Sequence, residues 1–310
     1  SADAQGLQSV LVQRYFGAQL AERAARLREA ALATVREHDA AAERMLATGV
    51  ISRLERLQAQ AALADAAQQA RKARDEAQLA ATALARTLKV VAPLRPSSPL
   101  FVASQPLPAL QGFIDAALAQ HPGLSKVQAK RREAAALHDA QEALRKPQVL
   151  GFGLSDIRTG GGKPNWVAGV AVRWTLWDSV DRDQLAASGQ RKIEQAELTE
   201  QQARSDIALL VEKNWLAVEH ARTQYLAQQA QEDLARELLR LREASQREGT
   251  GTLLEWMDAR VNLAKVQTER AQTAHQYIQA LAALLQSTGQ SDAFGRYMAE
   301  ADIQIPSDAP

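Results

Sequence analysis

Apolar residues recur at alternating spacings of four and three along residues 59–84. The positions are Ala59, Leu63, Ala66, Ala70, Ala73, Ala77, Ala80 and Leu84. Such a heptad seam is typical of a helix packed lengthwise against another helix, and small seam residues allow close approach. Because residues 1–92 contain no proline, the pattern predicts two long helices, 7–47 and 52–89, that meet at Gly49.

The same arrangement returns two hundred residues later, with helices expected at 180–246 and 252–288 on either side of Gly249. Several identities keep this offset without a gap: Ala30/Ala230, Arg36/Arg236, Glu37/Glu237, Leu54/Leu254, Glu55/Glu255, Ala59/Ala259, Leu63/Leu263 and Leu84/Leu284. Identities at one fixed offset indicate an internal duplication. A helix of about 65 residues would extend about 100 Å, so we expect rods in a bundle.

Prolines and the change of period divide the chain into six predicted segments. They are a first helical hairpin at 1–90, a proline-rich connector with a short helix at 91–122, a helix at 123–146, a β-hairpin at 147–178, a second helical hairpin at 179–289 and a C-terminal tail at 290–310. The tail is weakly patterned and is expected to be packed coil or disordered. The first repeat lacks a counterpart of the β-hairpin, which indicates truncation or divergence.

The predicted β-hairpin shows a period of two instead of a helical period. In its second strand, Trp166, Val170, Val172 and Trp174 share one face, whereas Arg173 lies on the other. Trp166 and Trp174 are separated by about 26 Å at about 3.3 Å per residue, close to the height of the apolar band of an outer-membrane barrel. This face suits contact with lipid.

In the first strand, Leu150, Phe152 and Leu154 alternate with small residues. We assign these three side chains to the same membrane-facing surface, and residues 159–165 to the hairpin loop. An ordinary soluble hairpin with one face on a core would show the same alternation. The long helices on both sides favour the membrane interpretation, because they offer no globular core to cover the hairpin.

Composition excludes several functional classes. The net charge is +1, and no basic block alternates with aromatic residues, which argues against nucleic-acid binding. Cysteine is absent, and the five histidines show neither metal-ligand spacing nor a triad context. We therefore predict a protein that is not an enzyme, with no metal site and no cofactor.

The ordered set of features resembles the outer-membrane efflux proteins of the TolC family. It consists of the duplicated hairpin, "HPGLSKVQAKRREAAALHDAQEALRKPQVLGFG" as the helix–proline–strand entry, "WTLWDS" after the second strand and "GTGTLLEWMDA" at the hairpin turn. The resemblance implies a mostly α fold of long antiparallel coiled-coil hairpins in two repeats, with the β-hairpin joining a trimeric outer-membrane β-barrel. It also implies a homotrimer in the outer membrane, with most of the chain in the periplasm.

The resemblance further implies site residues and partners. Gly49, Val50, Gly249 and Thr250 would be the tips that contact a periplasmic adaptor (membrane fusion) protein, which acts with an inner-membrane pump. The role of the protein itself would be to conduct substrates passively from the adaptor and pump to the exterior, in an efflux or type I secretion system.

Three acidic residues, Glu55, Glu255 and Asp258, would line the periplasmic entrance, where repelling carboxylates favour cations. The alternative for Glu255 and Asp258 is that they only stabilise the start of a helix. For the whole chain, the alternative function is a soluble coiled-coil scaffold or a periplasmic adaptor.

Overall fold

The computed structural model describes residues 2–91, 94, 96–120, 122–143, 146–156, 165–174 and 182–306. The chain divides into two compact units. Unit 1 comprises Ser1–Ala119 and Ala208–Pro310, and unit 2 comprises Gln120–Ile207. We describe each unit by itself.

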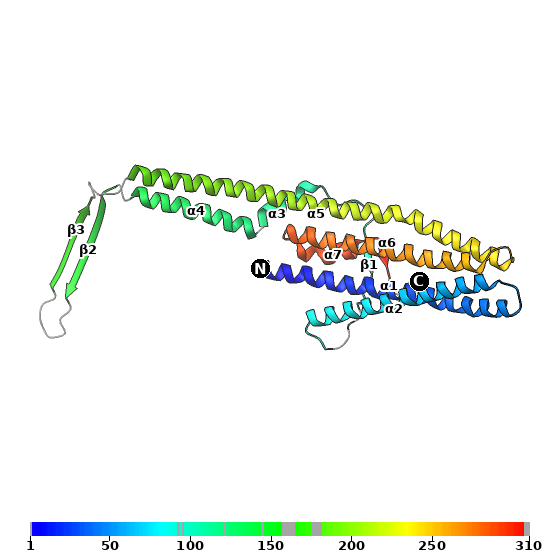
Figure 1. The fold of residues 1–310 in the computed structure, drawn as a ribbon. Helices are drawn as coiled ribbons and strands as arrows, with labels where there is room; N and C mark the ends of the chain where they lie inside the picture. Colours follow the sequence, from blue (N-terminus) through cyan, green and yellow to red (C-terminus); the bar gives the residue numbers. More distant parts are fainter. Residues whose placement is uncertain are drawn as a thin grey trace. The chain divides into compact units, whose positions relative to one another are not determined.

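Four helices form most of unit 1 (Figure 1). They are α1 (Ala2–Ala47), α2 (Arg53–Thr87), α6 (Leu253–Ser287) and the part of α5 (Arg182–Arg247) from residue 208 onward. Helix α1 packs against both α2 and α6, and α6 is hydrogen-bonded to α5. By their main contacts the helices follow the order α2–α1–α6–α5, with α2 and α5 at the two edges, and α2 also touches α6. These helices confirm both predicted hairpins to within a few residues, except that α1 begins five residues earlier.

The core of unit 1 is centred on α6. Its side chains Tyr277, Ile278, Leu281, Leu284 and Leu285 are at most 1% exposed. The seam predicted on α2 is also present, since six of its eight positions are buried and the other two are half-buried. An inner helix has neighbours on several sides and buries large side chains, whereas the edge helix α2 buries mostly alanine.

Unit 1 also contains several short elements. Strand β1 (Leu100–Val102) pairs with β4 (Ile303–Ile305) in an antiparallel ribbon. The helix α3 (Leu110–Gln120), the 3₁₀ helix η1 (Ser291–Ala293) and the helix α7 (Phe294–Glu300) complete the set.

The expectation of a coil or disordered tail was therefore wrong for residues 291–305. The Phe294 ring packs 5.8 Å from the Phe101 ring and 6.0 Å from the Phe16 ring, measured between centroids. These partners are distant in the sequence, so periodicity within the tail could not reveal its order.

Unit 2 contains α4 (Pro122–Ala143), β2 (Gln148–Asp156), β3 (Asn165–Arg173) and the first part of α5. Glu200 of α5 is buried and forms an ion pair of 3.2 Å with Arg131 of α4. The helices approach closely at Gly189, where an added Cβ would lie 2.5 Å from Nδ1 of His138. Strands β2 and β3 form the predicted hairpin, whereas residues 159–164 of the expected loop lie outside the described residues.

No helix in the described ranges is both long and apolar enough to cross a membrane.

Candidate functional site

The tip of the first helical hairpin is built around Gly49. Its φ of 73° lies in the left-handed region, which glycine adopts without the steric cost that Cβ imposes. The Gly49 N–H donates to the Leu46 carbonyl at 3.0 Å, and the Val50 N–H donates to the Met45 carbonyl at 2.8 Å. This Schellman pattern satisfies carbonyls at the end of α1 and reverses the chain.

The second tip repeats this geometry. Gly249 has a φ of 72°, its N–H donates to the Gln246 carbonyl at 3.1 Å, and the Thr250 N–H donates to the Ser245 carbonyl at 2.9 Å. Gly49, Val50, Gly249 and Thr250, the four predicted tip residues, are all exposed. The duplicated glycines therefore have one shared structural cause.

Each tip is followed by a capping box. In this motif the side chain of the first residue accepts a hydrogen bond from the backbone N–H three residues later, and the glutamate there accepts one from the backbone N–H of the first residue. Ser52 caps α2, and its N–H donates to Glu55 at 2.6 Å. Thr252 caps α6, and its N–H donates to Glu255 at 3.3 Å. The hydrogen bonds from the backbone and side chain of Ser52 hold the pKa of Glu55 below its usual value. The helix-start interpretation of Glu55 and Glu255 thus has direct structural support.

The three predicted entrance acids differ in their contacts. Glu255 also forms an ion pair of 3.2 Å with Arg242 of α5. The repeat-equivalent of Arg242 is Ala42, so Glu55 has no matching cation there. Asp258 is exposed and forms no ion pair with any described residue. Among the described residues, only Glu255 of the three is paired with a cation, and Asp258 is the one that takes no part in a capping box.

The strand register corrects the predicted membrane-facing set. Residues opposite each other in an antiparallel pair share a face. Phe152 pairs with Gly169 and Leu154 with Val167, whereas Val170 pairs with Gly151. The two groups therefore lie on opposite faces, and the expectation that all seven predicted residues share one face was wrong.

We call these two surfaces the Trp face and the Phe face. The Trp face carries Val149, Gly151, Gly153, Trp166, Ala168, Val170 and Val172, and the alternation continues to Trp174. The Phe face carries Gln148, Leu150, Phe152, Leu154, Val167, Gly169, Ala171 and Arg173. Alternation fixes the faces within one strand, but the register between strands decides which faces coincide.

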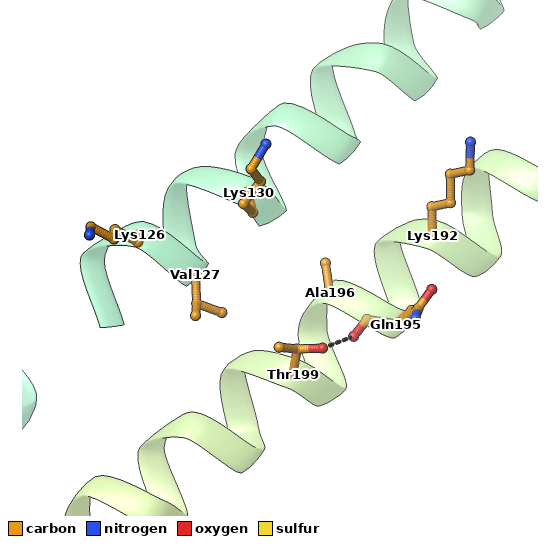
Figure 2. A pocket seen from close by; sticks show the side chains of 7 residues that line it. All are labelled: Lys126, Val127, Lys130, Lys192, Gln195, Ala196 and Thr199. Carbon is orange, nitrogen blue, oxygen red and sulfur yellow. Dashed lines mark hydrogen bonds between the residues drawn. The ribbon is translucent and has the colours of Figure 1, made fainter. Parts of the chain in front are cut away.

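A groove of about 350 Å³ lies between α4 and α5 within unit 2 (Figure 2). Val127 and Ala196 form part of its apolar lining, and Lys126, Lys130 and Lys192 surround it. The three lysines are exposed, and Lys130 is paired with Glu133 at 2.7 Å. The groove therefore lacks a buried polar group that would define a specific ligand site.

Within the described ranges, no three His, Asp or Glu side chains are grouped so that they could hold a metal ion.

Comparisons with known proteins agree with this geometry. The sequence profile of the family "Outer membrane efflux protein" matches residues 113–290. The structure is similar to the open-state MtrE outer membrane channel of Neisseria gonorrhoeae, with 18% sequence identity and a TM-score of 0.71, over 94% of this chain and 67% of that one.

Two further solved structures show the same fold. The CmeC outer membrane channel of Campylobacter jejuni has 18% identity and a TM-score of 0.66, over 96% of this chain and 66% of that one. CusC, which forms a transmembrane channel, has 19% identity and a TM-score of 0.74, over 93% of this chain and 69% of that one. No curated protein sequence gives a significant match. Since the family profile covers more than half of the chain, the protein belongs to the outer membrane efflux protein (TolC) family and is a non-enzymatic efflux channel of the outer membrane.

Proposed function

We propose that three copies of this chain assemble into a passive conduit, which receives substrates from a periplasmic adaptor and an inner-membrane pump. The observation that carries the proposal is that both edge helices of unit 1 expose apolar stripes. A ring of helices leaves no edge, and a heterologous contact between two different surfaces closes such a ring.

The edge helix α5 carries leucines on one face in two groups, with His220 and Thr223 exposed on the same face between them. The leucines, all exposed, are Leu209, Leu216, Leu234, Leu238 and Leu241. At about 100° per residue they fall within about 60° of one another, so they share one face of the helix. The buried residues Val211, Val218 and Leu239 lie on other faces, toward the unit. Exposed leucines grouped on one face in this way mark an interaction surface.

The other edge, α2, carries a complementary stripe beside its tip. Leu54 is 65% exposed and Leu57 is 54% exposed, and they are followed on the same face by the exposed residues Ala61 and Ala64. This face differs from the buried alanine seam that packs against α1.

The two stripes match in distance from their tips. Leu57 follows Gly49 by eight residues, and Leu241 precedes Gly249 by eight. Ala64 follows its glycine by fifteen residues, which is the distance by which Leu234 precedes Gly249. Because α2 leaves its tip and α5 approaches its own, the stripes would pair antiparallel, with Leu57 beside Leu241 and the small Ala64 opposite Leu234.

The tips are the surface that we propose for the adaptor. Val50 is 65% exposed and Thr250 is also exposed, and both are held by rigid Schellman turns. We propose that Glu55, Glu255 and Asp258 lie at the periplasmic entrance. Glu55 and Asp258 would provide most of its net negative charge, because Arg242 offsets the charge of Glu255 whereas a capping hydrogen bond leaves a carboxylate ionised.

The test of this function is the oligomeric mass of the natural full-length gene product in detergent. We expect a heat-sensitive trimer that precipitates when detergent is removed. A monomer or dimer that stays soluble without detergent would contradict the proposal and would favour the soluble coiled-coil scaffold or adaptor. The family assignment already favours the channel over these alternatives.

A further inference from the structure

Neither face of the β2–β3 hairpin is covered by described protein. On the Trp face, Trp166 is 75% exposed and Val170 72%. On the Phe face, Leu154 is 71% exposed and Phe152 48%. Both faces of the hairpin are therefore apolar and available, and a strand of a membrane barrel must place one toward lipid and the other toward the lumen.

The distribution of charge and aromatic rings decides between the two faces. Trp166 and Trp174 stand at the two ends of the Trp face, as in the aromatic girdles of outer-membrane barrels. The described side chains between them are all apolar. The Phe face instead includes Gln148 and the exposed Arg173, which the register pairs with each other. A charged residue on a lipid-facing surface is destabilising, so the Trp face suits lipid.

We propose that the Phe face lines the lumen and forms an apolar belt of Leu150, Phe152, Leu154 and Val167 in each copy. This proposal rests on the proposed function, since it needs the hairpin to be part of a channel wall. It also reassigns three residues that the sequence pattern placed against lipid. Barrel lumens are ordinarily polar, so an apolar belt would depart from the usual lining.

Phe152 has a defined place in this belt. An added Cβ on Gly169 would lie 2.7 Å from Cζ of Phe152, so the ring lies across the opposite strand in the space that glycine leaves. The ring therefore presents one π face to the Phe side of the sheet instead of projecting straight out. A flat aromatic surface of this kind contacts planar or apolar parts of a passing molecule.

The physical effect of the belt concerns permeation. Molecules with apolar surface contact an apolar wall at lower cost than a hydrated ion does, because burying apolar surface is favourable whereas desolvating a charge is costly. The cargo class that fits is an amphipathic organic molecule. Small hydrated ions would cross this section poorly.

The first experiment measures single-channel conductance of the natural full-length protein in planar bilayers. The test variant is Phe152→Ser combined with Leu154→Ser, and the matched control is Val170→Ser on the Trp face. We expect the test variant to conduct small ions better, because its serine hydroxyls would hydrate the lumen wall, and the control to match the unsubstituted protein. Equal conductance in all three proteins would overturn the proposal.

A second measurement serves if the double variant does not assemble. Since the chain has no cysteine, Phe152→Cys and Val170→Cys each introduce one thiol. We expect a charged, water-soluble methanethiosulfonate to label the thiol at position 152 and reduce conductance, and to leave position 170 unmodified. The reverse pattern would overturn the assignment of the faces. No reaction at either position in a conducting channel would show that other protein covers the Phe face, which also overturns the proposal.

These outcomes separate the two proposals. Failure of the proposed function would appear as an unsubstituted protein that is neither trimeric nor conducting. Failure of the belt alone would appear in a trimeric, conducting protein whose variants behave in one of the contradicting ways.

Discussion

The two helical hairpins of unit 1 share backbone devices but not side-chain surroundings. Each ends its first helix with a left-handed glycine and begins its second with a capping box. Yet α6, in the second repeat, buries sixteen residues and includes large side chains, whereas α2, in the first, buries seven and six of these are alanine. The duplication thus preserved the turns, and the position of each helix in the bundle determined its side chains.

The two hairpins also differ in side-chain contacts at one pair of equivalent positions beside the tips. In the first hairpin Arg56 of α2 forms an ion pair with Asp39 of α1. At the equivalent positions the second hairpin has Trp256 and Leu239, both buried in one cluster. The Trp256 ring also packs against His38 of α1, with centroids 3.6 Å apart. An edge helix can use a charged pair here, whereas an inner helix meets a third helix and uses apolar packing.

The largest difference in the free energy of unfolding should appear at equivalent positions of which one is buried and the other exposed. Ile278 is fully buried in α6, and its counterpart Gln78 is exposed on α2. We expect Ile278→Ala to lower the free energy of unfolding by about 2–5 kcal/mol, because it removes buried methyl groups and leaves a cavity. Gln78→Ala should change it by less than about 0.5 kcal/mol. Denaturant unfolding of the detergent-solubilised protein, followed by circular dichroism, would measure both, and similar losses would refute the distinction between inner and edge helices.

Substitution of the tip glycine should destabilise both hairpins by a similar amount, since the two tips share one backbone geometry. Replacing Gly49 or Gly249 with alanine forces a Cβ into the left-handed region, which costs about 1–2 kcal/mol. Gly295→Ala in α7 is the matched control, because that position has open space and no left-handed φ, and it should not destabilise. Thermal unfolding of the three variants would check this. A tip variant as stable as the control would contradict the Schellman account.

The residues that end the second helix of each hairpin, α2 and α6, should differ in backbone strain. Lys89 adopts a φ of 54° after α2, where the second repeat has Gly289 at 73°. The Lys89 N–H donates to the Arg86 carbonyl at 3.2 Å, so the same turn is made with a strained residue. We expect Lys89→Gly to stabilise the protein by about 0.5–1 kcal/mol, as relief of strain exceeds the added entropy of the unfolded chain. Lys89→Ala should not stabilise it, and a gain from alanine equal to that from glycine would refute the explanation.

The two repeats should also differ in how their stability depends on pH. Glu232 in the second repeat is ionisable, whereas its counterpart in the first repeat is the buried Leu32. Burial would raise the pKa of Glu232, but the hydrogen bond from Arg270 at 2.6 Å and the charges of Arg236 and Arg270 lower it below the usual value. A lowered folded-state pKa stabilises the fold above the ordinary glutamate pKa, and this contribution disappears as the pH falls through the lowered value. We therefore expect Glu232→Gln to reduce the loss of stability between neutral and acidic pH, measured by denaturant midpoints. An unchanged pH slope would count against this ion-pair cluster.

The sequence predicted the helices well because long amphipathic patterns, glycine turns and capping residues are local. The predicted seam of α2 was confirmed for the same reason. The packing of the tail was missed because Phe294 finds its aromatic partners far away in the chain. The faces of the hairpin were misassigned because the register between β2 and β3 depends on pairing across the turn, which alternation within one strand does not specify. The role of Glu55 and Glu255 at the entrance remains a proposal beside their observed capping role.

The most direct measurement concerns the contact between the two edges. In the natural full-length protein, Leu57→Cys combined with Leu241→Cys places one thiol on each edge stripe, at equal distance from the tips. We predict that oxidation links copies through disulfides into a reducible band of trimer mass, while either single substitution gives at most a dimer. Val10→Cys with Leu241→Cys, which pairs α1 with the same α5 position, is the matched control and should not give a trimer. If the double variant stays monomeric after oxidation, or if it links only within one copy, the account of ring closure through α2 and α5 is contradicted.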